Sequence, residues 1–270
     1  MFDPSLTRSE RVGVLATFVF AALIIGFLVL PILTIVPLSF TADSILSYPV
    51  ENWSLRWYRV LIDNPIWGQV LKNSLFIASF ATVIATVLGT LAAIGLTRRD
   101  CPWPGTLTAF LLTPMIVPVI ITGVSSYFFY TKLGLTNSFT GMILAHSILG
   151  TPFVVITVSA TLQGFDENQR RAAYSLGARP WLAFRTVVMP QIAPGIVSGA
   201  LFAFITSFDE VIVALFIAGT EQYTLPRQMF SGIRENLDPT IAAVATVMIV
   251  VSLAILTLAQ LTAARSHKNG

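Results

Sequence analysis

The chain is 270 residues long, and 55% of its residues are hydrophobic while only 11% are charged. Soluble domains carry about 25% charged residues, so this composition, with a mean hydropathy of +0.79, excludes an ordinary soluble protein and indicates an integral membrane protein. The net charge of +3 does not suggest a nucleic-acid-binding surface, and a single cysteine, Cys101, excludes an internal disulfide.

Six apolar stretches are long enough to cross a bilayer, since a transmembrane helix needs about 20 mostly apolar residues. Backbone polar groups in lipid must be satisfied within the segment, which favours helices over strands and predicts an all-α protein. The first stretch is longer than the apolar region of a signal peptide, about 7–15 residues, so we interpret it as an uncleaved span. The expected spans are residues 12–38, 68–96, 106–130, 139–162, 193–218 and 240–263.

Lysine and arginine are distributed unequally between the connectors, and the side richer in them is expected to be cytoplasmic. With the N-terminus inside, the inner segments carry ten of these residues against five acidic ones, whereas the outer segments carry six of each. Both termini are therefore expected in the cytoplasm.

Three of the expected spans contain residues that interrupt helices. These are Pro31 and Pro37, Pro114 and Pro118, and Gly150 with Pro152. Transporters build substrate sites at discontinuous helices, where a cavity or a neighbouring helix satisfies the freed carbonyls. Ordinary kinking explains each proline taken alone, whereas the three spans together favour a transport pathway.

The longest inner connector, residues 163–192, has the local chemistry of two short helices joined at a glycine. Asp166 suits the N-cap of a helix that runs from Glu167 to about Leu176. Gly177 follows where a helix end needs a left-handed residue, and Pro180 suits the first turn of a second helix. The pattern predicts a docking element on the cytoplasmic face.

This connector resembles the EAA signature of ABC importer permeases. It reads Arg171-Ala172-Ala173, three residues, Gly177, nine residues and then Val-Val-Met-Pro190. The family has Glu where this chain has Arg171, and it has an Ile-x-Leu-Pro end. By this resemblance the first short helix is a coupling helix that inserts into a groove of an ATP-binding subunit.

The segment SFDEVIVALFIAGTEQYTLPRQMFSGIREN is similar to the fifth span and outer loop of spermidine/putrescine-type importers, and in particular to their second permease. The resemblance implies import of a small organic cation such as a polyamine. Other amines, amino-acid derivatives and aminophosphonates remain open as substrates, because related permeases carry them.

The same resemblance implies the organisation and the partners of the chain. A first helix and outer connector (residues 1–66) would precede a transmembrane domain of the type I ABC importer fold (67–263) and a cytoplasmic tail (264–270). Partners would be an ATPase dimer that holds ATP and Mg, a second permease, a periplasmic binding protein and the bilayer of a bacterial inner membrane. The chain itself would be no enzyme, would bind no cofactor and would bind no nucleic acid.

Two adjacent carboxylates, Asp209 and Glu210, interrupt an apolar run that has no other charge between Arg185 and Glu221. A charge at the bilayer centre costs about 2.5–3.5 kcal/mol, so such groups are expected to face a cavity or a partner. On a continuous helix the two would point about 100° apart. Glu210 would then share a face with small residues, which favours close helix packing.

Asp209 would share its face with the bulkier Phe202 and Phe216. We expect the carboxylates to attract a cation in the pathway, with Phe202, Phe208 or Phe216 stacking on its ammonium groups. Three alternatives stay open. They are pairing with Lys72 or Lys132, a helix-breaking cap, and a protonated Glu bonded to a neighbour.

Other features rank lower or exclude rival functions. His146, alone on an apolar helix, is expected to be a hydrogen-bonded structural residue. Leu225, Met229, Ile233 and Leu237 recur every fourth residue and predict a short amphipathic outer helix. No G-x-x-x-x-G-K-[ST] loop is present, which argues against ATP hydrolysis by this chain. The main rival is a proton-coupled secondary carrier with Asp209 or Glu210 as the relay.

Overall fold

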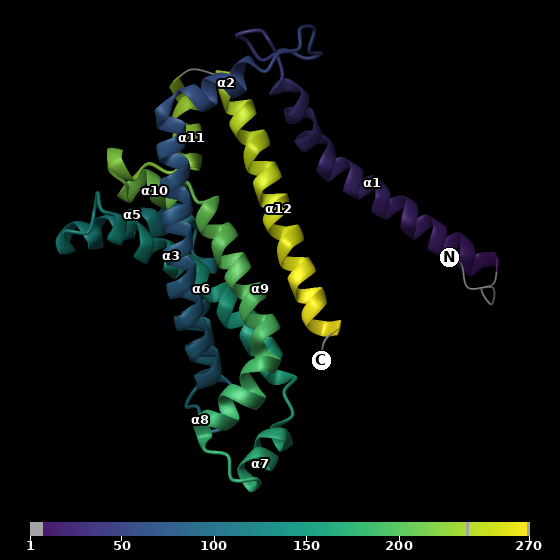
Figure 1. Ribbon diagram of the computed structural model, residues 1–270, viewed down its shortest axis with the longest axis vertical. Coiled ribbons are helices and arrows are strands. Elements are labelled where there is room, and N and C mark those ends of the chain that lie inside the picture. The colour runs from purple at the N-terminus through teal and green to yellow at the C-terminus, as the bar shows by residue number, and fades with distance from the viewer. Residues whose placement is uncertain (1–7, 236–237, 269–270) are drawn as a thin grey trace. The chain divides into compact units, whose positions relative to one another are not determined.

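The computed structural model describes residues 8–235 and 238–268, and these residues form helices joined by short connectors (Figure 1). In this part of the chain, β-structure is limited to one isolated bridge between Thr41 and Trp53. The all-α class is confirmed. The chain divides into two compact units, residues 1–63 with 235–250 and residues 64–234 with 251–270.

The smaller unit contains α1 (Arg8–Leu38), α2 (Arg56–Asp63) and the first part of α12 (Thr240–Lys268). In the connector after α1, the Phe40 ring lies against the rings of Trp53 and Tyr58, and the Tyr58 hydroxyl is 2.7 Å from that of Ser39. The apolar window of α1 is not buried by the rest of the described chain.

The larger unit is built around three long helices, α3 (Pro65–Leu96), α6 (Phe139–Gln163) and α9 (Met189–Phe208), which pack on one another. Its other elements are α4 (Pro104–Ile116), α5 (Val119–Leu133), α7 (Glu167–Ser175), α8 (Pro180–Ala183), the π-helix Phe184–Val188, α10 (Ile212–Ile217), the 3-10 helix Thr220–Gln222 and α11 (Leu225–Glu235). Figure 1 shows α7 and α8 at one end of α9 and α10 at the other.

Small residues bring the long helices of this unit close together. A Cβ added to Gly150 of α6 would lie 2.9 Å from the Cβ of Ala203 on α9. A Cβ added to Gly199 would lie 2.5 Å from Oγ1 of Thr157 and 2.8 Å from Cα of Val154. Helices that meet through such residues approach closely and gain van der Waals contact without a hydrophobic driving force.

We expect Gly199→Val to destabilise the chain by about 1–3 kcal/mol, the usual cost of overpacking a filled core. Gly68→Val is the matched control, since nothing lies within 4 Å of a Cβ added at Gly68. Thermal unfolding of both variants in detergent checks the expectation. Equal melting temperatures would show that the contact between α6 and α9 is not tight.

The third expected span is not one straight helix. α4 and α5 meet at a bend of 99° after Ile116. Pro118 precedes α5 and cannot donate a backbone hydrogen bond, so the helix is interrupted where the sequence places this proline.

Four described helices are long and apolar enough to cross a membrane, and the bent pair adds a fifth if it counts as one span. α12 contributes a shorter apolar segment, Thr240–Ala254, within the described residues. The expected count of six is therefore not confirmed. Leu237, the last residue of the predicted amphipathic pattern, lies outside the described residues, whereas α11 confirms that a short helix forms there.

The predicted bounds of the fifth span, residues 193–218, are wrong at both ends. The helical segment already begins at Pro180 and ends at Phe208, and α10 begins only at Ile212. A π-turn precedes Pro190, with the Met189 N–H donating to the carbonyl of Phe184. Because Pro190 has no N–H to donate, the wider turn accommodates a position where an α-helical bond is lost.

Candidate functional site

The two carboxylates lie at a break between helices, not on a continuous helix. Asp209 caps the C-terminus of α9, and its N–H donates to the carbonyl of Ile205 at 3.0 Å. Its side chain is exposed, whereas the neighbouring Glu210 is only 8% exposed. The break therefore separates the two acids into one that is accessible and one that is enclosed.

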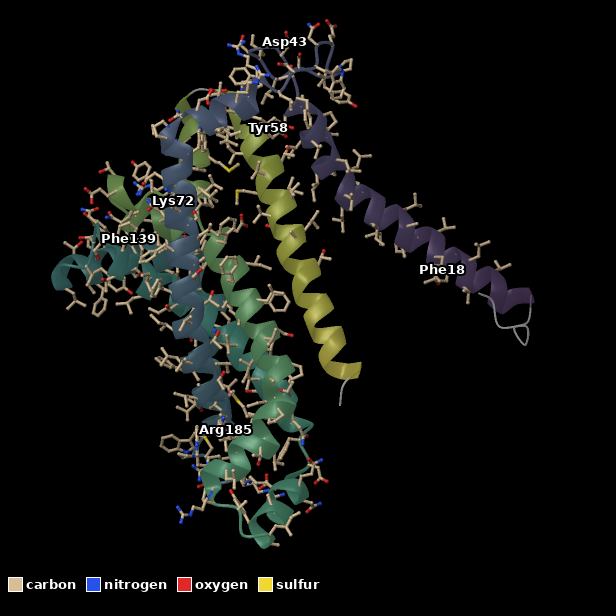
Figure 2. All side chains as sticks on the ribbon, viewed as in Figure 1. Phe18, Asp43, Tyr58, Lys72, Phe139 and Arg185 are labelled. Carbon is tan, nitrogen blue, oxygen red and sulfur yellow. The ribbon has the colours of Figure 1, made fainter. Side chains whose placement is uncertain are left out.

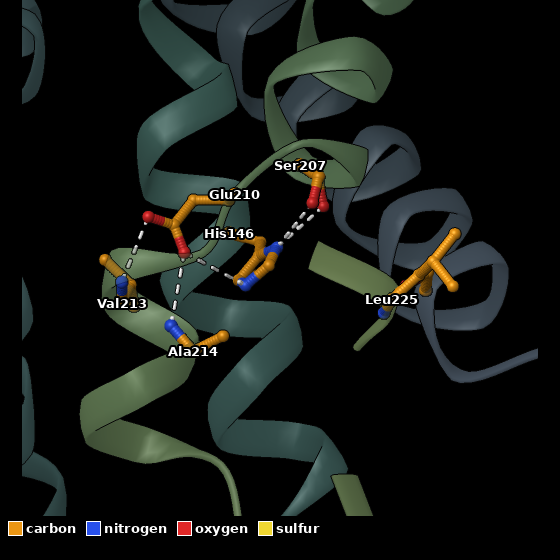
Figure 3. Close-up of polar contacts among 7 residues, drawn as sticks. His146, Ser207, Glu210, Val213, Ala214 and Leu225 are labelled. Atoms are coloured by element: carbon orange, nitrogen blue, oxygen red, sulfur yellow. Dashed lines mark hydrogen bonds and ion pairs between the residues drawn. The ribbon is translucent and has the colours of Figure 1, made fainter. Parts of the chain in front are cut away.

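Glu210 caps the N-terminus of α10 (Figure 3). Its Oε1 accepts from the N–H of Val213 at 3.0 Å, and its Oε2 accepts from the N–H of Ala214 at 3.2 Å. A carboxylate there satisfies free backbone donors and interacts favourably with the helix dipole. Of the alternatives left open by the sequence, the helix-breaking cap describes Glu210. In the described part of the chain, neither acid forms an ion pair with Lys72 or Lys132.

His146 of α6 contacts both sides of the break (Figure 3). Its side chain is fully buried, and its Nδ1 lies 2.8 Å from the hydroxyl of Ser207 and 3.1 Å from the carbonyl of Ser207. Its Nε2 lies 4.0 Å from Oε2 of Glu210. The expectation of a hydrogen-bonded histidine is confirmed, but the sequence did not predict its contact with the carboxylates.

The predicted aromatic wall beside Asp209 does not form a single face. Phe216 belongs to α10, beyond the break, where its ring packs against Gly123 of α5. Phe208 is buried, and its ring stacks on Phe204 at a centroid distance of 5.8 Å. Phe202 is exposed, so of the three predicted aromatic residues it is the most accessible.

The break lies at the end of α9 that is remote from α7 (Figure 1). Figure 2 shows the same separation, with Arg185 near the start of α9 and Lys72 on α3 toward the other end of this unit. The 20 residues of α9 span about 30 Å at a rise of about 1.5 Å per residue, which matches the hydrocarbon core of a bilayer. Asp209 therefore lies at the C-terminal end of a helix that is long enough to cross a bilayer.

The segment after α10 is held by polar residues of α3 that the sequence analysis did not single out. The Asn73 side-chain amide donates to the carbonyls of Glu221 at 2.8 Å and Tyr223 at 3.0 Å. The Leu225 N–H donates to the hydroxyl of Ser74 at 2.7 Å. These bonds fix the connector between α10 and α11 against α3. In the sequence, Asn73 and Ser74 are adjacent polar residues in an apolar span, and this pair could have indicated the contact.

The predicted pair of short helices joined at Gly177 forms as expected. Asp166 caps α7 by accepting from the N–H of Asn168 at 2.9 Å. Gly177 adopts a left-handed conformation with φ of 84°, and Pro180 is the first residue of α8. Each feature follows from local chemistry, so the sequence was sufficient to predict it.

α7 presents an open surface, because none of its residues is buried. Arg171 and Ala172 are exposed, Ala173 is half-buried, and Leu176, which follows α7, is 89% exposed. A cavity of about 800 Å³ opens beside α7, at the ends of α3 and α6. Its lining includes the arginines Arg98, Arg99, Arg170 and Arg171. This end of the unit combines apolar and basic surface, which suits contact with another subunit.

Apolar spans, a charged break at one end and an exposed helix pair at the other define a membrane transport protein. The family model "Binding-protein-dependent transport system inner membrane component" matches residues 85–268, so the chain belongs to that family of multi-pass membrane permeases. The resemblance to importer permeases stated from the sequence is confirmed.

Two relatives and one solved structure illustrate the similarity. The spermidine/putrescine transport system permease protein PotC of Haemophilus influenzae is 34% identical over 243 residues, covering 90% of this chain and 94% of that protein. The putrescine transport system permease protein PotI of Escherichia coli K12 is 34% identical over 230 residues, covering 83% and 82%. A bacterial ABC transporter that imports the polysaccharide alginate has a TM-score of 0.73 at 16% identity, covering 96% and 99%. The expected type I permease fold is thereby confirmed.

Removing the cap carboxylate is expected to loosen α10. Glu210→Leu deletes both acceptors and should lower stability by about 0.5–2 kcal/mol, the usual effect of losing a helix cap. Glu210→Gln keeps one acceptor oxygen and should lose less. Thermal unfolding in detergent separates the two variants, and melting curves that match the unmodified chain would show that the cap contributes nothing.

Proposed function

We propose that the chain is the permease subunit of an ATP-driven importer that moves a small organic cation, such as spermidine or putrescine, into the cytoplasm. The observation that carries the substrate class is the 34% identity to a spermidine/putrescine permease over 90% of the chain. The exposed Asp209 at the break after α9 supplies a group of the required charge. A cation attracted to this carboxylate would also meet the exposed ring of Phe202, as in cation–π binding.

The proposal includes the partners expected from the resemblance. ATP and Mg would bind to a separate ATPase dimer, and α7 would transmit its closure to the spans. A second permease would complete the pathway, a periplasmic binding protein would deliver the substrate, and the assembly would lie in a bacterial inner membrane. The exposed surface of α7, with Arg171, Ala172 and Ala173 leading to Gly177, supports a docking role.

Within this importer class, the negative charge of Glu210 and Asp209 indicates the kind of substrate. In the described residues, Glu210 accepts hydrogen bonds only from backbone N–H groups and its one ion-pair partner is His146, whereas Asp209 has no ion-pair partner. Acidic groups without a cationic partner favour polyamines and other amines over aminophosphonates, which carry negative charge.

Uptake by cells that lack their own polyamine importers tests the proposal. Cells that express the chain with its partner subunits should accumulate radiolabelled spermidine or putrescine, and an excess of the unlabelled amine should abolish the signal. A labelled aminophosphonate serves as the comparison. Accumulation of the aminophosphonate without that of either amine would overturn the proposed substrate class.

A further inference from the structure

We propose that His146 is a positioning residue that holds the break between α9 and α10 in the shape that exposes Asp209. The proposal rests on the proposed function only for its transport measurement. It is carried by the contacts of His146 with Ser207 and Glu210, the residues on either side of Phe208 and Asp209.

The first contact satisfies a carbonyl that the break leaves free. In a continuous helix the Ser207 carbonyl would accept from the N–H of Val211, but Val211 lies outside both helices. Ser207 is buried, so solvent does not replace that bond. An unsatisfied buried carbonyl is costly. In the tautomer with a hydrogen on Nδ1, the His146 imidazole removes this cost by donating to the carbonyl at 3.1 Å, and the Ser207 hydroxyl at 2.8 Å accepts from the same N–H.

The second contact reaches the other side of the break. Nε2 of His146 faces Oε2 of Glu210 at 4.0 Å, which is too long for a hydrogen bond but places the ring against the cap of α10. One rigid side chain thus contacts the last turn of α9 and the carboxylate that caps α10.

The position of His146 is itself fixed by close packing. Gly150, one turn further along α6, packs on Ala203, one turn before Ser207 on α9. The two backbones therefore hold the ring beside Ser207 without freedom to move away. Because its neighbours on both sides are fixed in this way, Asp209 is held at the end of α9 with its carboxylate exposed.

Without the hydrogen bond from His146, the buried carbonyl of Ser207 would have no partner. The chain would then gain by extending α9 through residues 209–211, which would take Glu210 away from the N–H groups of α10 and change the surroundings of the Asp209 carboxylate. The expected consequence is weaker capture of a cation and not loss of the folded chain.

Two amide variants separate this role from a general structural one. The side-chain amide of His146→Asn lies near the place of Nδ1 and can donate to the Ser207 carbonyl, whereas that of His146→Gln lies near Nε2 and cannot. We expect KM for spermidine uptake to stay within about twofold for His146→Asn and to rise about tenfold for His146→Gln, equivalent to about 1.4 kcal/mol. Vmax and the amount of assembled importer should change little in both. Equal KM values for the two variants, or equal losses of assembled importer with KM unchanged, would overturn the proposal.

A second measurement does not depend on transport. Val211→Cys, in a chain whose Cys101 is replaced by Ser, reports the shape of the break through its rate of reaction with a water-soluble thiol reagent. His146→Gln should change this rate and His146→Asn should not. If the unmodified importer moves no polyamine but the labelling rates differ as stated, the proposed function fails and the positioning role stands. Identical labelling rates in all three backgrounds would overturn the positioning role.

Discussion

Replacing residues 168–176 by a glycine/serine linker of equal length is expected to abolish ATP-driven uptake while the chain remains folded in the membrane. None of the residues of α7 is buried, and its contacts include α8, the π-helix and Gln191 at the start of α9, so its removal leaves the packing among α3, α6 and α9 in place. In the proposed function, its exposed surface, which includes Arg171 and Ala172, would receive force from the ATPase. Co-purification with the ATPase and uptake of labelled spermidine measure the two steps.

A matched pair of point variants at Gly177 tests α7 with a smaller change to the chain. Gly177 has a φ of 84°, and nothing lies within 4 Å of a Cβ added there, so only the backbone conformation restricts this position. Gly177→Asn should be tolerated, because Asn adopts left-handed conformations readily, whereas a β-branched residue does not. Gly177→Val should therefore reduce assembly and uptake. If the linker variant assembled and transported normally, α7 would have no coupling role.

Asp209→Asn is expected to raise KM for spermidine by at least about tenfold with little change in the amount of assembled importer. The amide keeps the volume of the side chain but removes its charge, and two unit charges about 4 Å apart interact by about 4 kcal/mol at an effective dielectric constant of about 20. Even a fraction of that interaction gives a tenfold effect, since each tenfold change corresponds to about 1.4 kcal/mol. Initial rates of uptake over a range of spermidine concentrations measure it.

The control for this variant is Asp63→Asn, which removes an exposed carboxylate at the end of α2, a residue that the sequence also predicts on the outer side. Its KM should not change. If Asp209→Asn took up spermidine with the same KM as the unmodified chain, the only role of Asp209 would be to end α9.

The parts of the fold that follow from neighbouring residues were predicted well. The capped helix from Glu167, the turn at Gly177 and the restart at Pro180 each depend on one residue and its immediate backbone. The interruption at Pro118 was also visible, although the bend of 99° was not, because its size depends on how α5 packs against α10.

The candidate site depends on contacts between residues far apart in the sequence, and these could not be read from local patterns. The apolar run around Asp209 predicts a continuous helix, but His146, 61 residues away, satisfies the carbonyl of Ser207 and makes the break possible. Asn73 likewise bonds to Tyr223 across 150 residues. Both contacts arise from the packing of α3, α6 and α9, which the residue order alone does not show.

We propose that this chain carries a cation inward only as part of an ATP-driven assembly. Its most direct test is uptake of labelled spermidine by liposomes that contain the chain with its partner permease and ATPase, with the binding protein outside. We expect accumulation when ATP is enclosed with the ATPase domains and none when a pH gradient replaces ATP. Accumulation driven by a pH gradient in liposomes that contain this chain alone would contradict the claim.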